Sequence, residues 1–261
     1  MLIENLSLNG GLTLSGAVNP PVVTSGLILE FRPNSYPGSG NIWYNTVNSY
    51  SYIQGTVAGN PAFNSNTGFT FAEIPLPNYQ GIDVGNWPAI NFGTSSYTIE
   101  IWFKIPNNPG SSPPLINKNQ YDGTSENVKT PYQVYVGGPD SVNFVVWGNT
   151  IGGVNGITLP NTVQNNTWYQ TVGVWNYGTN VLQAYLNGFA NGFPGDLSIM
   201  YGQDPRNSWP VRIGYAKTGF AVPDNINQFV GSIGIVRIYG KALSGFEIQQ
   251  NFSADRGIFG I

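Results

Sequence analysis

The segment 97–105 reads YTIEIWFKI, and its apolar residues recur at every second position. Successive side chains of an extended chain point to opposite faces, so Ile99, Ile101 and Phe103 share one face. Glu100 lies on the other face. This period of two predicts a β-strand with one buried face and one face in solvent, and it makes Glu100 a solvent-facing residue.

Other short segments have the composition of β-strands, and turn residues separate them. Residues 177–180 (YGTN) join two of these segments, and Asn187-Gly188 is the pair that a two-residue hairpin with positive φ values prefers. Repeated hairpins of this kind indicate an antiparallel sandwich of two sheets. The further predicted strands are 27–31, 68–73, 132–136, 142–147, 168–176, 181–187, 211–215 and 229–239.

One helix start is clear in the sequence. Ser244 and Glu247 have the spacing of a capping box, in which each side chain accepts a hydrogen bond from the other residue's backbone amide. Apolar residues follow at the positions that continue a helical turn. We therefore predict a short C-terminal helix over residues 244–252.

The composition agrees with a β protein that is rich in turns. The 261 residues include 34 glycines and 19 prolines, and only 9% are charged, against about 25% in an average soluble protein. Charged side chains normally cover helix surfaces, so this balance disfavours a helical protein. An aromatic content of 14% is too high for a disordered chain.

Counting residues excludes several classes of protein. Histidine and cysteine are absent, which removes the usual zinc ligands, the Ser-His and Cys-His dyads and all disulfides. The net charge is -3 and no lysine or arginine run occurs, so we expect no nucleic-acid partner. No apolar stretch approaches the ~18 residues of a membrane helix, and residues 1–9 lack the pattern of a signal peptide. We expect a protein that is made in the cytoplasm and has no membrane partner.

The first 25 residues differ from the rest of the chain. Their alternating apolar residues are Leu6, Leu8, Leu12 and Leu14. A turn at 9–11 separates the two pairs, and Pro20-Pro21 follows. A lone hairpin cannot bury these leucines, so residues 1–25 are predicted to form a β-hairpin arm and linker that attaches to a partner protein. A mobile tail is the alternative. The main domain is predicted over residues 26–261.

Five segments carry a resemblance to a known family. They are the first strand 26–31 (GLILEF), the central strand 97–103, the hairpin 184–188 (AYLNG), the last strand 229–239 and the ending 242–261. In this order they resemble laminin-G-like, concanavalin A-type jelly-roll domains, which are common in structural proteins of bacteriophages. The ending is similar to that of such domains in phages of marine and cyanobacterial hosts.

The resemblance implies a concanavalin A-like jelly roll over residues 26–261 and a structural role in a phage virion. The sequence departs from the family at 30–33, where members often carry an aspartate, and at 71–73, where many have an aspartate-rich turn. We therefore carry over no metal or ligand site from the family.

Catalysis is not expected. Related sandwich glucanases use two carboxylates on one strand, two or four residues apart, because alternation directs both side chains to the same groove. Glu100 lacks such a partner, since Trp102 and Lys104 occupy those positions. Folding could still bring together two of the scattered acidic residues, which include Glu30, Asp83, Asp122, Asp140, Asp196, Asp204, Asp224 and Glu247. We predict no catalytic residue.

Two kinds of ligand remain open. A calcium site needs six to eight oxygen ligands, and Asp122 and Asp140 are candidates, with ordinary turns as the alternative. We predict no cofactor and keep calcium as the alternative. Exposed aromatic rings bind sugars by stacking. The candidate platforms beside loops are Trp43, Tyr44, Trp147 and Trp209, with a place in the core as the alternative.

These observations favour a non-enzymatic structural protein of a phage virion, such as a capsid decoration, head fibre or tail-associated protein. Its partners would be capsid or tail subunits bound through the N-terminal arm, and a homo-oligomer is expected. The alternative is a glycan-binding adhesin or receptor-binding module that binds glycans of a host surface. A glycoside hydrolase is the third choice, since fold alone does not fix function.

Overall fold

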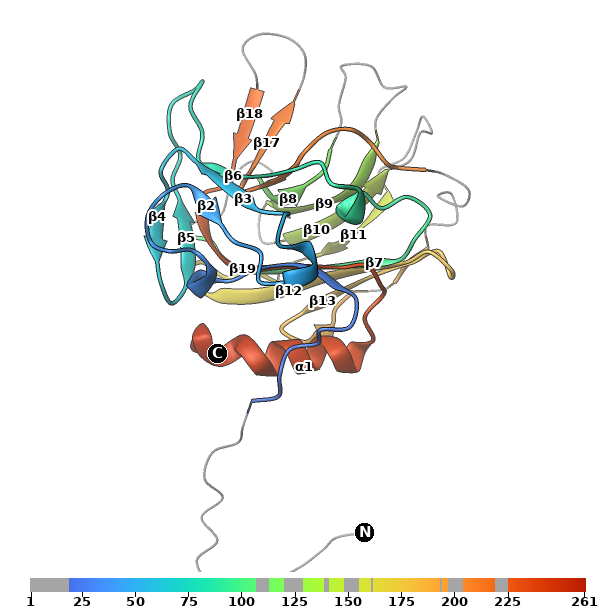
Figure 1. The fold of residues 1–261 in the computed structure, drawn as a ribbon. Helices are drawn as coiled ribbons and strands as arrows, with labels where there is room; N and C mark the ends of the chain where they lie inside the picture. The colour runs from blue at the N-terminus through green and yellow to red at the C-terminus, as the bar shows by residue number, and fades with distance from the viewer. Residues whose placement is uncertain are drawn as a thin grey trace, which may run out of the picture.

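Two antiparallel β-sheets stack face to face, and one α-helix lies against the outer side of the larger sheet (Figure 1). Within the residues that the structure describes, sheet A has nine strands, sheet B has eight, and a two-stranded sheet pairs β17 with β18. The predicted all-β sandwich with a C-terminal helix is therefore confirmed. The structure is a computed structural model that describes residues 19–106, 113–119, 129–138, 141–147, 155–160, 162–192, 194–196, 204–218 and 225–261.

Sheet A has the strand order β14-β13-β12-β7-β19-β5-β4, with β1 paired to β19 and β15 paired to β13. The segment that opened the sequence analysis is β7, and it lies between β12 and β19. The strands of sheet A are β1 (Leu27–Phe31), β4 (Ala62–Asn64), β5 (Gly68–Phe71), β7 (Tyr97–Lys104), β12 (Trp168–Asn176), β13 (Val181–Leu186), β14 (Phe189–Ala190), β15 (Gly195–Asp196) and β19 (Gly231–Tyr239).

Sheet B has the strand order β11-β10-β9-β8-β16-β6-β3-β2. Its strands are β2 (Ile42–Trp43), β3 (Gly55–Ala58), β6 (Gly81–Gly85), β8 (Pro114–Asn117), β9 (Thr130–Gly137), β10 (Ser141–Trp147), β11 (Asn155–Leu159) and β16 (Val211–Ile213). The remaining elements are β17 (Tyr215–Thr218), β18 (Asn225–Gln228), the helix α1 (Gly245–Asp255) and the 3-10 turns η1 (Pro33–Ser35), η2 (Asn48–Tyr50), η3 (Pro88–Ile90) and η5 (Arg256–Ile258).

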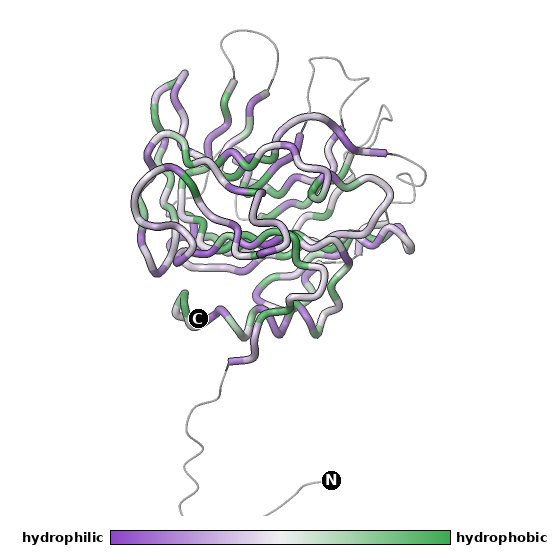
Figure 2. The backbone as a smooth tube through the Cα atoms, in the orientation of Figure 1, coloured by the Kyte–Doolittle hydropathy of each residue, from purple (hydrophilic) through white to green (hydrophobic). Residues whose placement is uncertain are grey.

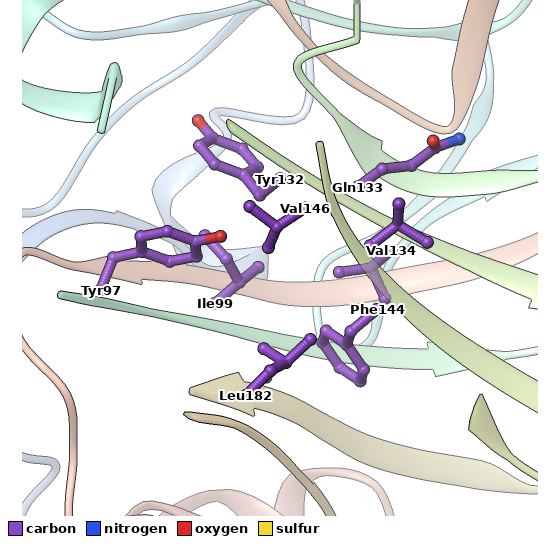
Figure 3. A pocket seen from close by; sticks show the side chains of 10 residues that line it. Tyr97, Ile99, Tyr132, Gln133, Val134, Phe144, Val146 and Leu182 are labelled. Atoms are coloured by element: carbon purple, nitrogen blue, oxygen red, sulfur yellow. The ribbon is translucent and has the colours of Figure 1, made fainter. Parts of the chain in front are cut away.

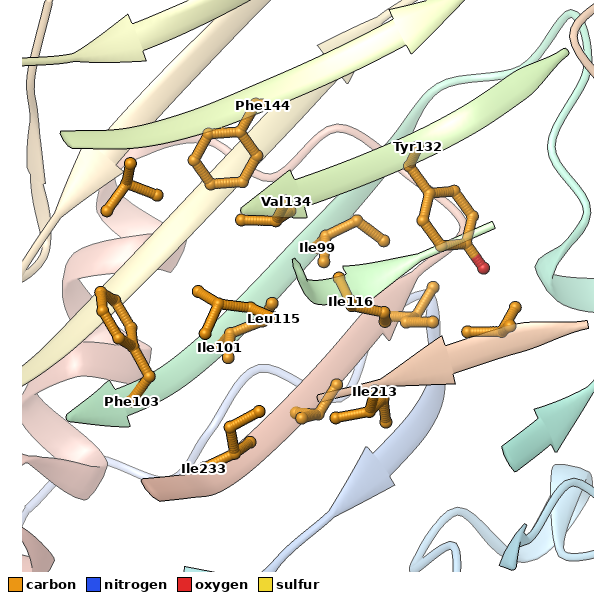
Figure 4. Close-up of a cluster of buried hydrophobic side chains, with 14 of the residues drawn as sticks. Ile99, Ile101, Phe103, Leu115, Ile116, Tyr132, Val134, Phe144, Ile213 and Ile233 are labelled. Carbon is orange, nitrogen blue, oxygen red and sulfur yellow. The ribbon is translucent and has the colours of Figure 1, made fainter. Parts of the chain in front are cut away.

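The main core lies between the two sheets. Ile99, Ile101 and Phe103 of β7 are buried there together with Val134 of β9, as Figure 4 shows. This confirms the predicted apolar face of segment 97–105. The sheets approach so closely that a Cβ atom on Gly173 of β12 would lie 2.1 Å from the Phe144 ring. Hydrophobic and hydrophilic residues alternate along many strands, as the backbone colouring shows (Figure 2).

Two predicted hairpin turns are confirmed. Residues 177–180 join β12 to β13, where Asn176 pairs with Val181 and Asn180 has a φ of 54°. Asn187 and Gly188 have φ values of 50° and 82° and connect β13 to β14. Glycine adopts this left-handed backbone because it has no Cβ atom, and asparagine does so because its short polar side chain can hydrogen-bond locally to the backbone.

The strands that the sequence analysis missed are short. Segments 27–31 and 168–176 were predicted with the bounds of β1 and β12, and the other predicted strands differ from the structure by a few residues. The missed strands β2, β3, β4, β6, β8, β11, β14, β15 and β18 have two to five residues each. In so few residues a period of two cannot be distinguished from a loop.

The C-terminal helix begins as predicted. The Ser244 hydroxyl accepts a hydrogen bond from the Glu247 amide, and the Glu247 carboxylate accepts one from the Ser244 amide at 2.9 Å. The helix continues three residues beyond the predicted end, to Asp255. None of the described helices has the length and apolar character needed to cross a membrane.

The prediction that Glu100 faces solvent is wrong. Glu100 and Trp102 are 0% exposed, because α1 covers this face of sheet A. The Trp102 ring stacks on Phe252 of α1 and on Phe259, with ring centroids 5.8 and 4.6 Å apart. The alternation identified two chemically different faces, but the polar face lies against a second layer of protein instead of water.

Charged side chains gather between sheet A and α1, where they form the Arg237 cluster of Glu30, Glu100, Arg237 and Asp255. Arg237 of β19 is 0% exposed, and its Nε and Nη1 donate hydrogen bonds to Glu30 at 2.8 Å and Glu100 at 2.7 Å. Its Nη2 lies 2.6 Å from Oδ2 of Asp255, an ion pair whose angle is not that of a hydrogen bond. Arg32 binds the other oxygen of Asp255 at 2.8 Å.

The cluster is stabilised by its own charges. Burial alone raises the pKa of Glu30, but the Arg237 guanidinium and the Thr46 hydroxyl favour the ionised form, so the pKa of Glu30 lies below its ordinary value. Burial likewise disfavours the charged form of Arg237, yet Glu100 and Asp255 together raise its pKa well above the ordinary range. Both partners are therefore charged at neutral pH.

Replacing Glu30 should make stability depend less on pH. The folded pKa of Glu30 is lower than the unfolded value of about 4.3, so its stabilisation is present above that pH and is lost as the pH falls through the folded pKa. We expect Glu30→Gln to lower the urea midpoint of unfolding at pH 7. The gap, which is the difference in urea midpoint between variant and wild type, should narrow below about pH 4. The exposed Glu73→Gln is the control and should show no gap. A Glu30→Gln gap that stays constant down to pH 3 would contradict this assignment.

The chain enters the domain before the boundary predicted at residue 26. Val23 is buried beside Leu243 and Ile248, and its amide donates a hydrogen bond to Oδ1 of Asn251 at 2.8 Å. The Gln250 side chain donates to the carbonyl of Pro21 at 2.7 Å. The leucines of the predicted arm, Leu6, Leu8, Leu12 and Leu14, lie outside the described residues.

Two truncations should therefore behave differently. Removing residues 1–18 keeps all the described contacts, so we expect an unchanged free energy of unfolding. Removing residues 1–25 also removes the buried Val23 side chain and its hydrogen bond to α1, and it should lower the free energy of unfolding by about 2 kcal/mol. Urea denaturation of both truncated proteins checks this. Equal free energies of unfolding for the two truncated proteins would show that Val23 does not stabilise the packing of α1.

Candidate functional site

The structure places the predicted aromatic platforms in different environments. Trp43 is 0% exposed and stacks on Phe31 at 5.0 Å, so its prediction as a sugar platform is wrong. Tyr44 is 47% exposed, and Trp209 is half-buried. Trp147 ends β10, and its side chain lies outside the described residues.

A different group of aromatic residues forms an exposed array. Tyr52 is 54% exposed, and its ring centroid lies 5.4 Å from that of Trp87 and 6.2 Å from that of Tyr50. The Trp87 indole N–H donates to the carbonyl of Val84 at 2.7 Å, which fixes the orientation of that ring. The sequence analysis missed this array because Tyr52 and Trp87 are 35 positions apart and neither lies in a strand.

Strand order brings polar residues to the same end of sheet B. β16 lies between β8 and β6 and runs antiparallel to both, so the start of β16 lies beside the ends of its two neighbours. Lys118 follows β8, Asn86 follows β6, and Trp209 precedes β16. The Lys118 ammonium group donates to Oδ1 of Asn86 at 2.7 Å and to the carbonyl of Trp209 at 2.5 Å.

We define the sheet-end cluster as Tyr52, Asn86, Trp87, Lys118, Trp209 and Arg212. Asn207 holds its segments together, because its amide nitrogen donates to the carbonyls of Lys118 at 2.9 Å and Lys129 at 2.7 Å. Asn86 is exposed. The cluster therefore combines one exposed and two half-buried aromatic rings, an exposed amide and two buried cationic side chains.

Arg212 lies between two aromatic rings. Its guanidinium carbon is 5.3 Å from the centroid of Trp209 and 5.8 Å from that of Tyr215, distances at which cation–π attraction operates. Its Nε is 4.0 Å from Oδ1 of Asp83. Arg212 is 8% exposed, and its Nε and Nη1 atoms are buried without a hydrogen-bond partner. Burial, and to a lesser extent Arg212, lower the pKa of Lys118 to about 8, so most of the Lys118 side chains are charged at pH 7.

Asp83 is held by two tyrosine side chains. The Tyr215 hydroxyl donates a short hydrogen bond to one carboxylate oxygen, and the Tyr79 hydroxyl donates to the other at 3.3 Å. Burial, and then the bond to Asp83, raise the pKa of Tyr215, so its phenol stays protonated. In this arrangement Asp83 is an acceptor that orients Tyr215, and Tyr215 is not a nucleophile.

The other acidic candidates do not form a site in the described part of the chain. Glu100 and Glu30 are brought together by folding, but both are bound to Arg237 beneath α1. Asp122 and Asp140, the calcium candidates, lie outside the described residues. Among the residues that the structure does describe, no three acidic side chains are grouped in a way that could hold a metal ion.

The described residues also form two hollows away from the sheet-end cluster. One is a cavity of about 10 Å³ in the core, between residues such as Tyr97, Tyr132 and Phe144 (Figure 3), and it is too small for anything larger than one water molecule. The other is an open groove of about 540 Å³ between β13 and the start of α1, where Tyr185 and Glu247 are among the lining residues.

Comparisons with known proteins agree with this architecture. The laminin G model, described as "Concanavalin A-like lectin/glucanases superfamily", matches residues 77–249, which is about two thirds of the chain. A comparison with curated protein sequences gives no match. The matched residues include β7, β12, β16 and β19, and hence the centre of both sheets.

Similar solved structures share the fold at low sequence identity. The binding domain of Paraclostridial Mosquitocidal Protein 1 has a TM-score of 0.64 and 16% identity, over 87% of this chain and 52% of that one. A Trypanosoma rangeli sialidase has a TM-score of 0.63 and 14% identity, over 94% of this chain and 37% of that one. The binding domain of botulinum neurotoxin DC in complex with SialylT has a TM-score of 0.62 and 14% identity, over 88% of this chain and 51% of that one.

This chain thus spans about half the length of the toxin binding domains and about a third of the sialidase. The fold occurs in proteins that bind and in a protein that cleaves sugars, so it does not by itself distinguish the two functions. The sandwich, its strand order and the family match lead to one conclusion. The chain belongs to the Concanavalin A-like lectin/glucanases superfamily.

Proposed function

We propose that this chain is a non-enzymatic, glycan-binding module whose ligand lies on the sheet-end cluster. The observation that carries the proposal is the exposed Tyr52 ring, which lies edge to face with Trp87 and close in sequence to strand β3. Sugar rings stack on aromatic faces and satisfy their hydroxyl groups with nearby amides and charges. The exposed Asn86 amide provides such a group next to Trp87, and the buried Lys118 ammonium holds it by a hydrogen bond.

The structure supports binding more than cleavage. Glycoside hydrolysis needs two carboxyl groups that reach the substrate, and Glu100 and Glu30 are enclosed beneath α1. Asp83 accepts hydrogen bonds from two tyrosines, and Tyr215 stays protonated. Two of the three similar structures are binding domains, and one of them was obtained with SialylT, which favours a glycan ligand by analogy.

We also propose that the module is displayed on a phage virion, as a homo-oligomer attached to capsid or tail subunits. Support for this comes from the order of sequence segments that resemble phage structural domains. The alternating leucines Leu6, Leu8, Leu12 and Leu14 add support, since they require a partner surface. Electron microscopy of purified particles with an antibody to the sandwich domain tests this part separately.

A glycan array followed by calorimetry tests the binding proposal. We expect Tyr52→Ala to weaken binding of the best glycan by about tenfold or more, because loss of one stacking ring removes roughly 1–2 kcal/mol. Tyr185→Ala, in the groove beside α1, is the matched control and should bind as the wild type does. Tyr52→Ala should unfold at the wild-type urea concentration within error, since the Tyr52 ring is 54% exposed. Tyr185 is half-buried against Leu243 and Ile248, so Tyr185→Ala should unfold at a lower urea concentration, and its binding is measured where it is fully folded.

The opposite pattern would contradict the proposed site. Loss of binding in Tyr185→Ala with retention in Tyr52→Ala would move the ligand to the groove. Release of sugar from any bound oligosaccharide would show that the module is an enzyme.

A further inference from the structure

We infer that the sheet-end cluster selects saccharides that carry an anionic group, which Arg212 binds and the positive charge of the buried Lys118 attracts. This inference rests on the proposed function and names the class of its ligand. It concerns the charge of the sugar, whereas the Tyr52 and Trp87 rings would bind neutral and acidic sugars alike.

The first observation is the uneven distribution of charge. The chain has 10 basic and 13 acidic residues and a net charge of -3. Four of the basic residues nevertheless lie in or beside the sheet-end cluster, namely Lys118, Lys129, Arg206 and Arg212. The described acidic residues nearby are Asp204, which is paired with the exposed Arg206 at 2.6 Å, and Asp83, which two tyrosines bind. Arg212 and Lys118 are therefore only weakly neutralised.

The second observation is that Arg212 lacks acceptors. Buried arginine groups are normally hydrogen-bonded, because an unpaired buried donor costs free energy. Nε and Nη1 of Arg212 have no partner, and the nearest carboxylate oxygen in an ion pair is 4.0 Å away, beyond hydrogen-bond distance. Oxygen atoms from outside the chain would supply the missing acceptors.

The third observation is that both cations are held in position before a ligand arrives. The Trp209 and Tyr215 rings flank the Arg212 guanidinium, which leaves its planar edge as the free part of the group. Lys118 is 0% exposed and donates to Asn86 and the Trp209 carbonyl, so its positive charge is fixed within the cluster. Preorganised donors lose little entropy when they bind an anion.

The combination fits an acidic sugar better than a free anion. Trp209 contacts Arg212, and its carbonyl accepts a hydrogen bond from Lys118. Asn86 joins Lys118 to the segment of the half-buried Trp87, whose ring lies against the exposed Tyr52. A ligand that fills the cluster therefore needs an anionic group at one end and a stacking ring at the other. A carboxylated sugar and a sulfated sugar both meet this requirement.

Matched pairs of ligands test the inference on the full chain. Calorimetry compares trigalacturonate with its methyl ester, and sulfated lactose with lactose, so that each pair differs only in the anionic group. We expect the acidic member of at least one pair to bind about tenfold tighter, and the pair that responds identifies carboxylate or sulfate as the preferred group.

Three variants test which side chains cause the preference for acidic over neutral sugars. Arg212→Gln and Lys118→Gln should each reduce the ratio of acidic-sugar to neutral-sugar affinity to within about twofold. Arg206→Gln removes the same charge from an exposed residue paired with Asp204, and it should keep the wild-type ratio. Because Arg212 and Lys118 are both buried, urea denaturation first confirms that each variant folds, and the ligand pairs measured on the unchanged chain test the inference without either variant.

The outcomes separate the two proposals. Equal affinity for both members of every pair, with binding that still depends on Tyr52, would overturn the inference and leave the glycan site standing. The inference would also be overturned if Arg206→Gln lowered the ratio of acidic-sugar to neutral-sugar affinity as much as Arg212→Gln does. Net charge alone would then explain the preference. Absence of binding for every sugar would contradict the proposed function itself.

Discussion

The guanidinium group of Arg237 is the contact on which the rest of the architecture depends. It is completely buried, and carboxylates from β1, β7 and the end of α1 surround it. These carboxylates come from positions 30, 100 and 255, so a single side chain joins the beginning, middle and end of the domain. A buried charge without partners costs several kcal/mol, which makes the set of four groups interdependent.

This constraint explains why the polar face of β7 is not a binding surface. Glu100 hydrogen-bonds to Arg237, to the Gln170 amide at 2.9 Å and to the Asn251 amide at 2.8 Å. Trp102 on the same face packs against Phe252 and Phe259. The outer side of sheet A is thus occupied by the chain itself around these residues. The exposed Tyr52 ring and Asn86 amide lie at the end of sheet B, and the buried cations Lys118 and Arg212 lie beside them.

Much of the fold could be predicted from local sequence. The alternation in segment 97–105, the turn at Asn187-Gly188 and the capping box at Ser244 each depend on residues within a few positions of one another. The burial of Glu100 could not be predicted in this way. Alternation shows that one face is polar, but it does not show whether water or another charged layer lies against that face.

The candidate site was harder to predict for a related reason. Asn86, Lys118 and Arg212 are far apart in the sequence, and only the order β8-β16-β6 brings them together. Trp43 ends the short strand β2 and Tyr44 follows it, and composition gave no means to distinguish a core ring from an exposed one. The predicted alternative, a place in the core, is correct for Trp43 and not for Tyr44.

A double-mutant cycle between Arg237 and Asp255 tests most directly whether the buried charges bind α1 to sheet A. The free energies of unfolding of the wild type, Arg237→Met, Asp255→Asn and the double variant would be measured in urea at pH 7. We expect each single change to cost about 3–5 kcal/mol and the double change to cost at least ~1 kcal/mol less than the sum. Costs that add to within ~0.5 kcal/mol would show that the two groups are independent and would contradict this role of Arg237.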